Sequence, residues 1–234
     1  MKNPELISMK QISSSLNQAS DRKEIFVLDH FEWELLQGDI QLISVIPGSG
    51  WRQFISILNG NLIPWQGEIY LKGNSIPNQN DKNRFERINQ TFGFIEPTQK
   101  LVSYLTISEN LSLPNWGKSK LARKYRINVQ ALLNWFELEN LCDRMAGQLS
   151  DDATAKILFL KAFVHQPDCI VAVWDNTWHM DWLKILKKLV KTIQISLIVL
   201  FPENMISKGE FRATHIFDGG KIRLYSKEND EHIH

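Results

Sequence analysis

The chain has 234 residues, of which 43% are apolar, and a formal net charge of +1. This length and apolar content allow one well-buried domain, and the balanced charge excludes a global field that would attract nucleic acid. The first residues, MKNPELISMKQISSS, lack the apolar core of a signal peptide. No apolar run approaches the roughly 18 residues that a bilayer span needs. We expect a cytoplasmic protein, soluble or peripheral, with Cys142 and Cys169 as unpaired thiols.

Short apolar, β-branched runs alternate with helical stretches along the chain. Their lengths fit strands buried in a sheet, and the alternation indicates an α/β fold. The expected strands are Ile40–Ile46, Gly67–Leu71, Thr91–Ile95, Cys169–Trp174 and Ser196–Phe201. The expected helices are Trp51–Leu58, Gln130–Phe136, Ala153–His165 and Trp182–Ile193.

Basic residues gather in two places. Four lysines of the last helix follow helical spacing opposite Leu186, Leu189 and Ile193, which predicts a solvated face: Lys184, Lys187, Lys188 and Lys191. The second group could face anionic lipid headgroups or an acidic partner, although a solvated loop is the favoured explanation. Its members follow Pro114: Lys118, Lys120, Arg123, Lys124 and Arg126.

The segment after the first apolar strand reads VIPGSGWRQ, where a phosphate-binding loop would read GxxxxGK[ST]. Such a loop holds phosphate by backbone N–H groups at a helix N-terminus, by a lysine, and by a hydroxyl that binds Mg²⁺. Here part of the cradle remains in Gly48, Ser49 and Gly50. The other positions differ: Val45 replaces the first glycine, Trp51 the lysine and Arg52 the Ser/Thr, and Gln53 follows. We expect the shape of the loop to be kept and its phosphate chemistry to be lost.

Further pieces follow in a fixed order: PWQGEIYLKGNSI, FGFIEP, YLTISENLSLP, LCDRMAGQLSDDATAKILFLKAFVHQPDCIVAVWDNTWHMD, LIVLFPEN and FDGGKI. In order and spacing, residues 7–222 resemble the nucleotide-binding subunit of an ABC transporter, closest in layout to those of bacterial lipid and lipoprotein transport. The resemblance implies an ABC ATPase-like P-loop α/β fold, with a RecA-like sheet core, an antiparallel β portion and a helical subdomain. It implies one domain over 1–234, with the core at about 1–96 and 166–225, the helical subdomain at about 97–165 and a polar tail at 226–234.

Several positions that carry chemistry in this family hold other residues here. The position of the adenine-stacking aromatic holds Leu16, which has no π-face. Pro97 stands at the Q-loop glutamine, with Glu96 beside it. Glu203 stands at the switch histidine, or Pro202 if the register shifts by one.

The signature motif, LSGGQ in the family, reads LSDDA over Leu149, Ser150, Asp151, Asp152 and Ala153. The two aspartates place carboxylates where the family docks a phosphate. Like unit charges about 4 Å apart repel by about 4 kcal/mol at an effective dielectric of about 20, so phosphate should be rejected. Ser150 is a good N-cap, and acids in the first turn suit the helix dipole, so the helix start should be kept.

The Walker B register has two readings. Counting back from Asp181, the D-loop position, puts Trp174 at the magnesium aspartate and Asp175 at the catalytic glutamate. With an insertion after Asp175, that residue becomes the metal-side aspartate and Asn176 replaces the base. Neither register gives an Asp-Glu pair, so no general base remains. His179 with Asp181 is better explained as D-loop contacts than as a catalytic pair.

Three tryptophans, Trp51, Trp174 and Trp178, map to the former nucleotide pocket or its edge. One interpretation is that these indoles fill the space of the nucleotide, and the other is that they are ordinary core residues.

The sequence favours a catalytically dead ABC-type subunit that scaffolds a membrane transport complex, with no cofactor and no bound metal. Expected partners are a membrane permease, an ABC ATPase subunit (self or homologue), or both, and not nucleic acid. Such a subunit would be cytoplasmic or peripheral at the inner membrane. Two alternatives are an adaptor in a non-transport assembly, which co-purifying proteins would reveal, and a divergent ATPase in which Arg52 replaces the lysine and Asp175 the base.

Overall fold

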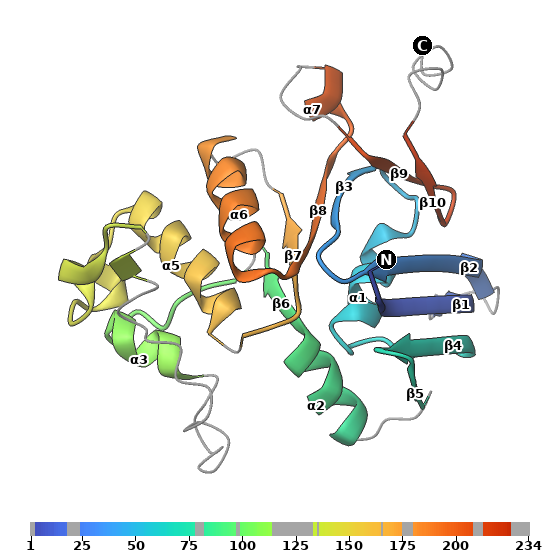
Figure 1. The fold of residues 1–234 in the computed structure, drawn as a ribbon, viewed down its shortest axis with the longest axis horizontal. Helices are drawn as coiled ribbons and strands as arrows, with labels where there is room; N and C mark the ends of the chain where they lie inside the picture. The colour runs from blue at the N-terminus through green and yellow to red at the C-terminus, as the bar shows by residue number, and fades with distance from the viewer. Residues whose placement is uncertain are drawn as a thin grey trace.

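The computed structural model describes residues 3–17, 24–77, 82–96, 99–113, 133–134, 136–164, 166–174, 180–207 and 213–225. These residues form two β-sheets with helices on their faces (Figure 1). Several residues singled out above lie outside the described ranges: Pro97, Asp175, Asn176, Trp178, His179, the second basic group and the 226–234 tail.

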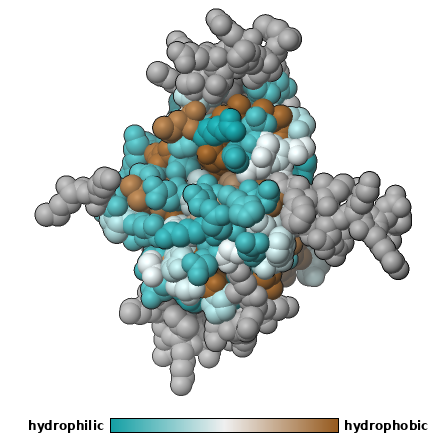
Figure 2. Space-filling view, turned by 90° about the vertical axis from the view of Figure 1, so that its right-hand side faces the viewer, coloured by the Kyte–Doolittle hydropathy of each residue, from teal (hydrophilic) through white to brown (hydrophobic). Residues whose placement is uncertain are grey.

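The first sheet is antiparallel, with the strand order β2-β1-β4-β5. Its strands are β1 (Glu5–Asn17), β2 (Glu24–Leu36), β4 (Gln66–Leu71) and β5 (Asn74–Ile76). The two long strands β1 and β2 were not among the strands expected from apolar runs, because serines and charged residues interrupt their hydrophobic pattern. The surface that this end of the molecule presents is mainly hydrophilic, with apolar residues showing between the polar ones (Figure 2).

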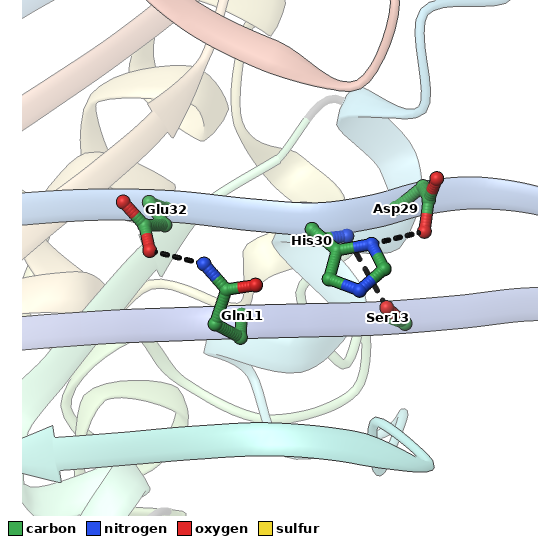
Figure 3. A network of polar contacts seen from close by, with 5 residues as sticks. All are labelled: Gln11, Ser13, Asp29, His30 and Glu32. Carbon is green, nitrogen blue, oxygen red and sulfur yellow. Dashed lines mark hydrogen bonds and ion pairs between the residues drawn. The ribbon is translucent and has the colours of Figure 1, made fainter.

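Irregular pairing in the middle of β1 and β2 further disturbs that pattern. Their register shifts between Met9 and Ser14, and Gln11 (φ 53°) and His30 (φ 47°) adopt left-handed backbone conformations. Two polar contacts join the strands where the register shifts. The His30 N–H donates to Ser13 Oγ at 3.2 Å, and the Gln11 amide donates to the Glu32 carboxylate (Figure 3). Bulges of this kind interrupt the ladder locally, and the pairing of β1 with β4 also shifts register between Lys10 and Ser13.

The second sheet has six strands in the order β10-β9-β3-β8-β7-β6. Its strands are β3 (Ile40–Val45), β6 (Phe92–Ile95), β7 (Cys169–Val173), β8 (Ser196–Pro202), β9 (His215–Asp218) and β10 (Lys221–Leu224). All pairs are parallel except β9–β10, a hairpin closed by Gly219 and Gly220, both at positive φ. The expected strands of this sheet are therefore confirmed to within one residue at each end.

The helices are α1 (Trp51–Leu58), α2 (Lys82–Thr91), α3 (Ile107–Ser112), α5 (Asp151–Phe163), α6 (Met180–Ile193) and α7 (Asn204–Ser207). Two 3₁₀ turns, η2 (Glu139–Leu141) and η3 (Ala146–Gln148), precede α5. Of the expected helix over 130–136, residues 133–134 are helical and Phe136 already lies in a turn. No described helix has both the length and the apolar content to cross a bilayer.

Two hydrophobic clusters lie on opposite faces of the six-stranded sheet. One joins α1 and the antiparallel sheet to side chains such as Cys169 and Val171 of β7. The other joins α3, α5 and α6 to the alternate residues Ile170 and Ala172. Residues from the expected helical subdomain thus share a core with the sheet, and the proposed division at 97–165 stays a prediction.

The amphipathic pattern of α6 is confirmed except at Lys187, which is half-buried, and at the last residue of the helix. Lys184, Lys188 and Lys191 are exposed, while Leu186 and Leu189 are buried. Ile193, expected on the apolar face, is 46% exposed because it is the last residue of the helix.

Candidate functional site

The loop between β3 and α1 is a tight turn. Ser49 N–H donates to Ile46 C=O at 3.2 Å, and Pro47 and Gly48 (φ 80°) occupy the central positions. Proline followed by a residue at positive φ is the arrangement of a type II turn. The Ser49 N–H is therefore engaged within the turn, and Ser49 C=O accepts from Gly220 N–H at 2.9 Å. Val45, at the position of the first glycine, is buried in the core at the end of β3.

Helix α1 begins directly after Gly50, a left-handed N-cap with φ 91° and no side-chain cap. The first two helical side chains pack on one another, with the Arg52 guanidinium carbon 4.5 Å from the centre of the Trp51 ring. Trp51 also packs against the apolar cluster on the α1 face of the sheet. A cation over an indole face is attracted to it, so the Arg52 charge is held on Trp51. Gln53 follows and is half-buried.

A pocket of about 390 Å³ opens beside these residues. Helix α1 contributes Trp51, Arg52, Ile55 and Ser56 to its wall. Asn59 and Asn61 follow from the end of α1, and Glu96 and Val173 come from the ends of β6 and β7. Motif order predicts Trp51, Arg52 and Glu96 at this place, whereas the convergence of the other lining residues depends on the order of the strands.

Glu96 is the one acidic residue among those that line this pocket. Burial raises the pKa of its carboxyl above the ordinary value. Its C=O accepts from the Gln99 N–H at 3.1 Å, which turns the chain back after β6.

We expect Glu96→Gln to raise the melting temperature at neutral pH. The folded-state pKa of Glu96 is above its unfolded value, so burying the ionised form costs stability at pH values above the folded pKa. That cost shrinks as pH falls through the folded-state pKa of Glu96. It is absent below the unfolded-state pKa, where the Glu96 carboxyl is neutral in both the folded and the unfolded chain. Thermal unfolding of both proteins from pH 4 to pH 8 tests this. A difference in melting temperature between the two proteins that is the same at every pH would contradict this prediction.

At the end of β7, Val173 and Trp174 belong to opposite faces of the six-stranded sheet. Val173 lines the pocket and packs against the α1-side cluster, while Trp174 is 2% exposed and belongs to the cluster with α5 and α6. Successive residues of a strand point to opposite faces. In the register that puts Trp174 at the magnesium position, that side chain faces away from α1. The other register puts Asp175 there, outside the described residues, and stays a prediction. Trp174 does not help to fill the space beside Trp51 either.

The signature segment forms a regular helix start. Ser150 Oγ accepts from the Ala153 N–H at 3.3 Å, which confirms the expected N-cap of α5. Asp151 and Asp152 are exposed in the first turn, and Asp152 forms an ion pair of 2.8 Å with Lys156. Leu149 is half-buried and packs against the α5-side cluster. Asp181 similarly lies in the first turn of α6 and accepts from Lys184 at 2.9 Å.

The remaining positions lie around the ends of the strands. Pro202 ends β8 and pairs with Val45, and Glu203 follows it, half-buried, before α7. Leu16 lies in β1 opposite Ile25.

The described side chains at this site differ from those that hold Mg–ATP in a P-loop. That ligand requires a lysine on its phosphates, a hydroxyl and a carboxylate on the metal, and free backbone N–H groups. The start of α1 offers an indole and a guanidinium, and the pocket end of β7 offers the isopropyl group of Val173. The one hydroxyl in the described lining, Ser56, lies a helical turn beyond Arg52.

A glycine-containing turn between a central parallel strand and a helix, with a four-stranded antiparallel sheet beside it, defines a P-loop cassette of the ABC type. The family description "ABC transporter" matches residues 28–177, and the chain belongs to this family. The structure of CbiO1 from Clostridium perfringens, described as part of the ABC transporter complex CbiONQ, superposes with a TM-score of 0.78 at 15% identity. The superposed region covers 98% of this chain and 91% of the CbiO1 chain.

Two curated relatives are similar over most of their length. The lipoprotein-releasing system ATP-binding protein LolD of Xylella fastidiosa is 23% identical over 207 residues, which is 86% of each chain. The putative hemin import ATP-binding protein HrtA of Staphylococcus haemolyticus is 26% identical over 224 residues, which is 93% of this chain and 99% of that one.

Proposed function

We propose that this chain is a non-catalytic ABC-type subunit, a pseudo-ATPase that serves as a structural component of a membrane transport complex. The observation that carries the proposal is the start of α1. Trp51 stands at the position of the lysine, Arg52 stands at the position of the Mg²⁺ hydroxyl, and the Arg52 guanidinium stacks on the Trp51 ring. The relatives described above are named for lipoprotein release and hemin import, which supports a transport setting.

The proposed partners are a membrane permease and a second ABC-type subunit, either another copy of this chain or a homologue. The chain keeps the ABC-type fold whose surfaces would contact these partners, including the pocket at the ends of β6 and β7. Asp151 and Asp152 are exposed at the start of α5. In a mixed pair these carboxylates would complete the partner's phosphate site badly, so at most one site of such a pair would work. We place the subunit in the cytoplasm, peripheral at the inner membrane.

We expect no tight binding of Mg–ATP to the purified chain. Trp51 and Arg52 stand where the ammonium and the Mg²⁺ hydroxyl would be, and the Ser49 N–H is engaged within the turn, so most of the interactions that hold a triphosphate are lost among the described residues. Isothermal titration with Mg–ATP should give a dissociation constant above roughly 100 μM, about −5.5 kcal/mol. The LolD protein of Xylella fastidiosa, titrated in parallel, serves as the positive control.

A dissociation constant well below that value would contradict the proposal. ATP turnover that Asp175→Asn abolishes would instead establish the divergent-ATPase alternative, since it would assign the base to this chain.

A further inference from the structure

The starts of α1 and α5 carry opposite charges. At the start of α1, Arg52 is exposed, the first turn has no acidic residue, and the Gly50 N-cap makes no side-chain hydrogen bond. The N-terminus of a helix already bears about half a positive charge, so the Arg52 guanidinium adds to it. At the start of α5, Asp151 and Asp152 are exposed, and their two negative charges exceed the half charge of that helix end.

Neither excess of charge is fully neutralised within the described part of the chain. Asp152 binds Lys156 at 2.8 Å, but none of the ion pairs among the described residues includes Arg52 or Asp151. Glu96 lines the same pocket as Arg52, yet it is half-buried and those ion pairs do not join it to Arg52. Among the described residues, Arg52 and Asp151 therefore remain available to charges on another molecule.

Both helix starts lie toward one edge of the six-stranded sheet. Helix α1 follows the turn at the end of β3. Helix α5 has 13 residues, a length of about 20 Å, and its far end lies beside the beginning of β6: a Cβ on Gly93 would be 2.2 Å from the Ala162 carbonyl oxygen. The start of α5 therefore points toward the edge at which β3 ends (Figure 1). A two-fold axis at this edge brings α1 of each copy to α5 of the other, so both contacts form together.

We propose that two copies of this chain pair without nucleotide, with Arg52 of each copy bound to Asp151 of the other. A guanidinium and a carboxylate form charge-assisted hydrogen bonds, often two in parallel, so each contact neutralises both excesses of charge. A homologue with the family's LSGGQ would instead present the bare, positive end of its helix to Arg52. The charges thus select a second copy of this chain over such a homologue. This inference rests on the proposed function, because it chooses between the two subunit partners named there.

Sedimentation velocity of the purified chain without nucleotide tests this pairing. We expect a dimer with a dissociation constant below about 100 μM. Salt should weaken it, because the Debye length falls from about 10 Å at 0.1 M to about 3 Å at 1 M. Arg52→Glu and Asp151→Arg each place like charges opposite one another in both contacts, so either variant alone should raise the dissociation constant about tenfold or more. Glu34→Arg, an equal change of charge at an exposed residue of β2, should leave it unchanged.

Mixing Arg52→Glu with Asp151→Arg is the deciding step. In a mixed pair each contact again joins one acidic and one basic side chain, so dimers should reappear at nearly the wild-type dissociation constant. Thermal unfolding shows separately that each variant is folded.

Four results would overturn the inference: a monomeric wild-type chain, a dimer that neither salt nor the two variants weaken, an equal loss with Glu34→Arg, or folded variants that do not recover on mixing. A monomer that binds no Mg–ATP would leave the proposed function standing. Dimers that form only with Mg–ATP would contradict the proposed loss of nucleotide binding as well.

Discussion

Gly67→Ala is expected to destabilise the protein by about 3 kcal/mol or more. Gly67 lies in β4 with φ 99°, and a Cβ there would sit 2.4 Å from the Gln11 carbonyl oxygen and 2.7 Å from that of Lys10. Both obstacles are backbone atoms of the β1 bulge, so they cannot move aside without breaking strand pairing. Urea unfolding should show a lower midpoint with an unchanged slope.

Gly73→Ala provides the matched control for this prediction. Gly73 also has a positive φ, 74°, but a Cβ there would meet no atom within 4 Å. The substitution should cost only the backbone strain, about 1 kcal/mol. Equal losses in the two variants would show that the close approach of β1 to β4 contributes nothing.

Phe54→Ala is expected to cost about 3–5 kcal/mol, the range for emptying a buried aromatic site. Phe54 is fully buried and fixes α1 to both sheets, with ring centres 5.6 Å from Phe31, 4.9 Å from Trp33 and 5.6 Å from Phe217. Removing it leaves a cavity under the helix that carries Trp51 and Arg52. The free energy of unfolding from urea titration measures this loss.

Tyr104→Ala is the control for loss of an aromatic ring without loss of burial. Its side chain is 76% exposed, so the change should stay within about 0.5 kcal/mol. A comparable loss from both substitutions would mean that the aromatic cluster around Phe54 is not a stabilising core.

The sequence predicted those parts of the fold whose signals are local. Helix α1 has the expected bounds because glycines precede an unbroken amphipathic run, and Ser150 caps α5 as its side chain requires. The parallel strands were found because burial on both faces makes them continuously apolar. In contrast, β1 and β2 escaped notice because bulges at Gln11 and His30 interrupt the two-residue period.

The site was predictable in its residues and less so in its geometry. Motif order located Trp51, Arg52 and Glu96, which the structure brings to one pocket. Spacing alone did not decide whether Trp174 or Asp175 holds the magnesium position, because one inserted residue changes the answer. The participation of Asn59 and Asn61 required the strand order, which no local signal carries.

The opposed orientation of Val173 and Trp174 limits how metal binding could be regained. An aspartate introduced at 174 would put an ionised group among the aliphatic side chains beneath α5 and α6, where burial of an unpaired charge would unfold the chain before any Mg²⁺ bound. At 173 the same substitution would present its oxygens to open solvent-filled space next to Arg52. A laboratory attempt to rebuild a working ATPase from this subunit would therefore start at residue 173 and leave the neighbouring indole untouched.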